Sequence, residues 1–182
     1  MSFFRNLFES KPAQTDQEYT ISLVDQLLDD KASPYLITNL KEFSQQYPDE
    51  ISSRGIPALI NAFTKFSEND NVINDLILIF ADLLRSENNQ KEENAKTFLQ
   101  CDDTIPNFVR ALDNKNPQVR VGSMHVLMMI ANLQPTLFTE TLTSHQPQMI
   151  RLFGSISDKN EQISSRFVNS IPKMVENNPD FQ

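Results

Sequence analysis

The 182-residue sequence is poor in the residues that define several common protein classes. Its single cysteine, Cys101, excludes an internal disulfide framework and a cysteine-based zinc site. Its three glycines are too few for the many turns of an all-β protein of this length. Because these glycines also lie far apart in the sequence, they cannot form a phosphate-binding glycine loop.

Positive charge and long apolar runs are also scarce. There are 16 Lys and Arg against 24 Asp and Glu, so the net charge is −8 and nothing predicts a nucleic-acid partner. The longest apolar runs, 76–81 and 126–131, are far shorter than the roughly twenty residues of a membrane-spanning helix. The apolar segment Met1 to Phe8 lacks the cleavage pattern of a signal peptide. We therefore expect a cytoplasmic protein.

What remains is the pattern of an all-α protein. Five of the ten prolines (34, 57, 106, 117 and 147) stand just before apolar stretches with a period near 3.6, the position that proline tolerates in a first helical turn. A turn is expected at 49–53 and a polar loop at about 86–94. The expected helices span about 15–29, 33–47, 55–66, 69–85, 95–100, 105–112, 117–133, 137–142, 147–156 and 161–177.

Self-comparison of the sequence reveals a repeat. The stretch 116–119 matches 160–163 at an offset of 44, and 55–63 resembles 104–112 at an offset of 49. A period of about 40–47 residues with three helices in each unit is typical of armadillo repeats. We therefore predict an armadillo-like right-handed superhelix, an α-solenoid of about four three-helix repeats, over 15–182. Residues 1–14 form an apolar segment and a polar lead-in, and we expect Met1 to Phe8 to cover the open end of the first repeat.

The search for catalytic and metal-binding residues yields little. His125 and His145 are the only histidines. A nucleophilic pair of Cys101 and His125 is one hypothesis, but a free cysteine at a helix end is ordinarily a small buried apolar residue. The doublets Asp29-Asp30 and Asp102-Asp103 lie at helix boundaries, where Asp is favoured as a cap. We predict a non-enzyme without cofactor, metal ion or small-molecule substrate.

Binding residues are predicted on the last helix of each repeat, because this helix lines the concave groove of armadillo stacks. Asn74, Asn132 and Asn169 lie on these helices and are candidates for holding the backbone of an extended peptide. A solvated helix face would explain them equally well. Arg120 and Arg166 are candidates for contacts with an acidic partner, or for salt bridges between repeats.

One part of the sequence resembles a known family. The stretch Leu40 to Tyr47 (LKEFSQQY), followed by Gly55 to Ile60 (GIPALI), resembles the start of the globular head of the Uso-type vesicle-tethering factors, also called general vesicular transport factors. Shorter stretches agree in the same order, namely 1–5, 23–26, 117–120 and 161–163. The similarity extends through most of the chain.

The resemblance implies a non-enzymatic docking module in vesicle transport from the endoplasmic reticulum to the Golgi. It implies Rab-family GTPases, SNAREs or coat components as partners, and peripheral association with Golgi or vesicle membranes. The family's coiled coil and acidic tail do not occur in these 182 residues, so we expect either a fragment or a short protein that keeps only the head. The alternative is a generic cytosolic armadillo adaptor, such as a nucleotide-exchange cofactor of heat-shock-protein-70 chaperones.

Overall fold

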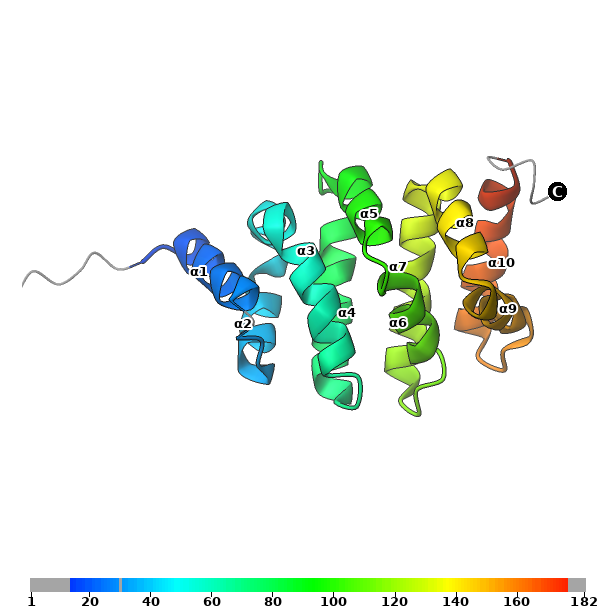
Figure 1. Cartoon of the computed structure of the whole chain (residues 1–182), viewed down its shortest axis with the longest axis horizontal. Coiled ribbons are helices and arrows are strands. Elements are labelled where there is room, and N and C mark those ends of the chain that lie inside the picture. The colour runs from blue at the N-terminus through cyan, green and yellow to red at the C-terminus, as the bar shows by residue number, and fades with distance from the viewer. Residues whose placement is uncertain (1–13, 30, 177–182) are drawn as a thin grey trace, which may run out of the picture.

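The computed structural model describes residues 14–29 and 31–176, and all of the regular structure in this part is helical (Figure 1). The segment Met1 to Phe8, which was expected to cover the first repeat, lies outside the described residues. The helices are α1 (Asp16–Leu28), α2 (Pro34–Ser44), α3 (Pro48–Lys65), α4 (Asp70–Leu84), α5 (Lys91–Gln100), α6 (Thr104–Ala111), α7 (Pro117–Leu133), α8 (Pro135–Ser144), α9 (Gln146–Gly154), the short 3-10 helix η1 (Ser155–Ser157) and α10 (Glu161–Glu176).

The helices form two layers that advance along the chain in one direction (Figure 1). In one layer, α2, α4, α7 and α10 pack side by side in that order. In the other layer, α1 packs on α3, α3 on α5 and α6, α5 on α8, and α6 on α9. Every repeat therefore contacts its neighbours in both layers, which confirms the predicted all-α solenoid.

The predicted three helices in each repeat are found only in the second half of the chain. Repeats three and four are α5–α6–α7 and α8–α9–α10, whereas repeats one and two are α1–α2 and α3–α4. The turn predicted at 49–53 is wrong, because α3 runs through it from Pro48. Pro48 occupies the first turn, where proline is tolerated, and Asp49 and Glu50 suit the positive end of the helix dipole.

The continuous helix α3 takes the place of two helices. In Figure 1 its first and its last turns run in different directions, as α5 and α6 do in the next repeat. Pro57 lies inside α3 and has no N–H to donate to the preceding turn, which is the usual cause of a sharp bend. The bend preserves the three-part shape of the repeat without a loop.

The predicted loop at 86–94 is also shorter than expected, because α5 begins at Lys91. Asn94, which looked like a loop residue, is buried in this helix, and its Nδ2 donates to the Leu83 carbonyl at 2.9 Å. The Nδ2 of Asn88 donates to the same carbonyl at 2.9 Å. Two asparagines thus satisfy a carbonyl that the end of α4 leaves without a helical partner.

The starts of α1, α2 and α4 agree more closely with the predictions from the sequence. Thr15 and Glu18 form the predicted capping box at α1, with Glu18 N donating to Thr15 Oγ1 at 3.2 Å and Thr15 N donating to Glu18 Oε2 at 3.0 Å. Ser33 and Asn69 cap α2 and α4 with one bond each, and their side-chain oxygens accept from the backbone N–H groups of Leu36 at 3.2 Å and Val72 at 3.3 Å. These caps place the two helices that begin the α2–α4–α7–α10 layer.

The core is continuous through the stack, and its centre is a group of phenylalanine rings. Phe63 and Phe80 of repeat two contact Phe98 and Phe108 of repeat three, with ring centroids 5.1 to 5.6 Å apart. Each ring is almost completely buried. Because the rings come from four helices, this group joins repeats two and three into one apolar unit.

Replacing Phe80 by Ala should destabilise the chain by about 3–5 kcal/mol, because the substitution leaves a cavity where three aromatic contacts were made. Leu78→Ala on the same helix is the control, since Leu78 is 45% exposed and its truncation removes little buried surface. Urea unfolding followed by circular dichroism measures both. Equal losses for the two variants would contradict the position of this core.

Candidate docking surface

The last helices of the four repeats share one solvent-facing surface, which we call the last-helix surface. On α4 the buried residues face the neighbouring helices and leave a stripe with helical spacing at positions 71, 74, 75, 78 and 82. Similar stripes run along the other three helices. The main residues of the surface are Tyr35, Thr38, Glu42, Asn71, Asn74, Asp75, Leu78, Asp82, Gln118, Val121, His125, Met129, Asn132, Ser165, Val168 and Asn169.

The three predicted asparagines all belong to this surface. Asn74 lies on α4, Asn132 on α7 and Asn169 on α10. Asn132 Nδ2 donates to Ser170 Oγ at 3.3 Å and so links α7 to α10. Asn74 and Asn169 make no side-chain hydrogen bond to another described residue, so their amides face solvent. Their role in holding a peptide backbone stays a prediction.

The two predicted arginines both make contacts within the stack. Arg120 Nη1 donates to the carbonyls of Asn114 at 2.9 Å and Lys115 at 3.2 Å, so it fixes the loop before its own helix. Arg166 Nη1 on α10 lies 2.7 Å from His125 Nδ1 on α7. Arg166 therefore contacts repeat three through a hydrogen bond to an imidazole, whereas a salt bridge between repeats was one of the two predictions for this residue.

The contact with Arg166 defines the state of His125. Arg166 has only donor groups, so Nδ1 of the imidazole accepts the bond and its proton lies on Nε2. Burial lowers the pKa of His125, and the positive charge of Arg166 lowers it further. The neutral imidazole is thus part of the α7–α10 interface.

Other pairs of neighbouring last helices are also joined across this surface. Between α2 and α4, Thr38 Oγ1 donates to Asp75 Oδ2 at 2.8 Å, and Ser44 Oγ donates to Asp82 Oδ2 at 2.6 Å. Between α4 and α7 the joint is steric, because a Cβ on Gly122 would lie 2.7 Å from Cγ2 of Ile77. The absence of a side chain at Gly122 is what lets these two helices approach so closely.

The chemistry of an enzyme is not evident at Cys101 or His125. Cys101 is half-buried at the end of α5, and its Sγ contacts the Thr97 carbonyl at 3.4 Å. Burial raises the pKa of this thiol, and Asp102 and Asp103 raise it further, so the nucleophilic thiolate is disfavoured. Within 14–29 and 31–176, no group of three or more His, Cys, Asp or Glu side chains is placed to hold a metal ion.

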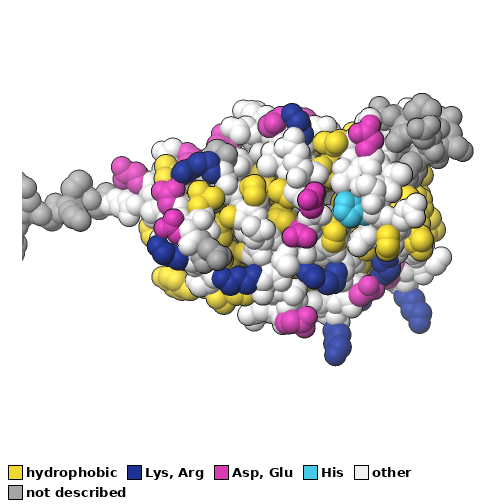
Figure 2. Space-filling model, viewed as in Figure 1, with side chains coloured by type: hydrophobic (Ala, Val, Ile, Leu, Met, Phe, Trp, Pro, Cys, Tyr) yellow, Lys and Arg dark blue, Asp and Glu magenta, His cyan; other side chains and the backbone are white. Residues whose placement is uncertain are grey.

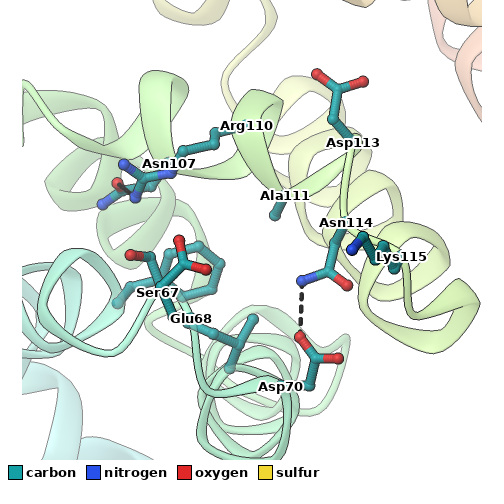
Figure 3. A pocket seen from close by; sticks show the side chains of 11 residues that line it. Ser67, Glu68, Asp70, Asn107, Arg110, Ala111, Asp113, Asn114 and Lys115 are labelled. Carbon is teal, nitrogen blue, oxygen red and sulfur yellow. Dashed lines mark hydrogen bonds between the residues drawn. The ribbon is translucent and has the colours of Figure 1, made fainter.

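Sequence reasoning missed a hollow of about 440 Å³ between repeats two and three (Figure 3). Phe63, Ile73 and Ala111 supply its apolar lining, and the remaining lining residues are polar or charged. Asn114 Nδ2 donates to Asp70 Oδ1 at 2.8 Å across the hollow. In the sequence these polar residues are typical of helix ends and turns. Their spacing near the repeat length was the only sign that they would meet.

Comparison with known proteins gives a likeness in fold. No protein-family model matches the chain, and no curated protein matches it at a significant level. Among solved structures, the crystal structure of Uso1-2 superposes with a TM-score of 0.74 over 94% of this chain, at 16% sequence identity. The likeness shows a shared fold. It agrees with the Uso-type resemblance of the sequence, and this chain spans 30% of the length of that one.

A first prediction for this surface concerns pH. The pKa of His125 is lower in the folded than in the unfolded chain, so the unfolded chain binds more protons near the ordinary histidine pKa of about 6.5. The His125 contribution should be complete above that pH and be lost over the range below it. Relative to His125→Gln, the wild type should lose more free energy of unfolding over this range. Parallel pH profiles for the two proteins would contradict the Arg166–His125 contact.

A second prediction concerns the α4–α7 joint. Gly122→Ala should destabilise the chain by about 1 kcal/mol, because displacing Ile77 costs more than the gain in helix propensity. Gly154→Ala is the matched control, since nothing lies within 4 Å of its added Cβ, and it should be neutral or slightly stabilising. Thermal unfolding of both variants gives the sign of each change in stability. A stabilising effect of Gly122→Ala would refute the close approach of α4 and α7.

Proposed function

We propose that this chain is a non-enzymatic protein-docking module that acts, like the head of a Uso-type tether, in vesicle transport between the endoplasmic reticulum and the Golgi. The observation that carries the proposal is the likeness to Uso1-2 over 94% of the chain. The stretch Leu40 to Tyr47, which resembles the same family, supports it independently of the superposition.

The last-helix surface is the part of the chain that we assign to docking. Its carboxylates, including Glu42, Asp75 and Asp82, lie on α2 and α4. On α7 and α10 no Asp or Glu occurs in 121–132 or in 162–172, so that half presents mainly apolar and amide groups. Leu78 on α4 and Val168 on α10 are 45% and 44% exposed on this surface. Exposed aliphatic groups among polar neighbours are typical of surfaces that bind other proteins.

The partners that we propose are proteins of the transport machinery, with a Rab-family GTPase first and SNAREs or coat components next. No helix in the described part of the chain is long and apolar enough to cross a membrane. We therefore propose that the chain reaches Golgi or vesicle membranes as a peripheral protein, through such a partner.

Binding of the purified chain to a panel of Rab GTPases tests the proposal. We expect the chain to retain at least one Rab in its GTP-bound form and to release it in the GDP-bound form. A double variant, Leu78→Asp with Val168→Asp, should weaken this binding by about tenfold or more, because each charge enters an apolar contact. Ile150→Asp is the matched control, since Ile150 is 71% exposed on α9, outside the last-helix surface.

Localisation in cells provides the second arm of the test. A fluorescently tagged chain should gather on Golgi membranes, and the double variant should not. Diffuse localisation together with no GTPase, SNARE or coat partner would refute the tethering role. Accelerated nucleotide release from a heat-shock-protein-70 chaperone would support the adaptor alternative in its place.

A further inference from the structure

A second hollow lies on a different part of the molecule, between repeats three and four. Its volume is about 600 Å³, and its walls are the loop from α6 to α7 and the connection from α9 to α10. In Figure 1 both of these connections lie along the lower edge of the stack. The last-helix surface is formed by helix stripes, whereas this site is formed by loops.

Basic side chains gather at this hollow. Lys115, Arg120 and Lys159 line it, and Arg151 reaches its edge through Asp113. We call these four residues the rim cluster. Figure 2 shows Lys and Arg side chains along this lower edge. The local concentration of positive charge is unusual, because the whole chain carries a net charge of −8.

The two carboxylates at the hollow are already engaged. Asp113 Oδ1 accepts from Arg151 Nη2 at 2.6 Å and from Nε at 2.9 Å. Asp158 Oδ1 accepts from the backbone N–H of Asn160 at 2.8 Å. Lys115 and Lys159 are both exposed, and neither has an ion-pair partner among the described residues. The ammonium groups of Lys115 and Lys159 are therefore available to bind an anionic ligand.

The rim cluster is also held in place. Arg120 binds the carbonyls of Asn114 and Lys115, while Arg151 binds Asp113 in the same loop. The loop that carries Lys115 is thus fixed by Arg120 of its own repeat and by Arg151 of repeat four. On the opposite wall, nothing lies within 4 Å of a Cβ added to Gly154, so there is open space for a ligand group.

We propose that this hollow binds an acidic segment of a partner protein through the rim cluster. Carboxylate side chains match the ammonium groups of Lys115 and Lys159, and the charge of Arg120, which carbonyl contacts do not neutralise, adds to the attraction. Charge complementarity of this kind favours association. A membrane surface fits less well, because lipid-binding clusters are dense runs of basic residues and this one is interrupted by two carboxylates in an acidic chain. The inference does not depend on the proposed function.

Fluorescence anisotropy with a labelled oligoglutamate peptide tests the site. The full chain should bind the peptide, more tightly at low than at physiological salt, and should not bind oligolysine at this site. Lys115→Glu with Lys159→Glu should weaken binding by about tenfold or more. Lys31→Glu with Lys96→Glu changes the net charge equally at exposed positions elsewhere, and should weaken it much less.

A variant that leaves the charge unchanged distinguishes peptide binding in the hollow from attraction by the overall charge of the protein. Gly154→Phe should fill the open space and weaken oligoglutamate binding, while circular dichroism shows that the helices remain. Leu78→Asn, which alters the last-helix surface without a change of charge, should leave this binding unchanged, so failure here and failure of the proposed function are distinguishable.

Three outcomes would overturn the proposal. The first is the absence of oligoglutamate binding at low salt. The second is an equal loss of oligoglutamate affinity in the two charge-reversed double variants, which would show that the peptide responds to the overall charge of the protein and not to this site. The third is binding to phosphatidylserine vesicles in preference to the peptide, which would make the ligand a lipid surface.

Discussion

Burial of apolar faces between neighbouring repeats is the constraint on which this structure depends. One pair or triplet of helices has apolar residues on more than one side and cannot cover them alone. Here the next repeat buries these apolar residues, most clearly where Phe63 and Phe80 contact Phe98 and Phe108. The layer of last helices, and with it the surface that it exposes, exists because this stacking aligns α2, α4, α7 and α10.

The same constraint explains why several residues that looked available for binding are used within the stack. Arg166 and Asn132 connect α7 with α10, and Arg120 fastens a loop. A polar residue at a seam between repeats has neighbours on both sides, so its hydrogen bonds are often made internally. Asn169 and Lys159 make no side-chain hydrogen bond to another described residue. Asn169 lies on a helix stripe that faces solvent, and Lys159 lies on a loop at the edge of the second hollow.

The sequence predicted the fold class and most helices, because local signals encode them. The capping box at Thr15 and the proline at position 117 mark helix starts, and α7 spans the predicted 117–133. It failed where tertiary contacts decide the conformation, at the unbroken α3 and at Asn94. The sequence did not predict the two hollows, since each is formed by residues of two different repeats. Many of their polar lining residues lie at helix ends or in turns, where such residues are common.

The fusion of two helices in α3 has a mechanical consequence. A loop between two helices can change its dihedral angles at little cost, but a continuous helix deforms only by straining its own hydrogen bonds. In repeats three and four, the loops between α5 and α6 and between α8 and α9 can therefore change conformation easily. In repeat two, the bent but continuous helix α3 resists such a change. Changes of shape should therefore be smaller between the two parts of α3 than between α5 and α6 or between α8 and α9.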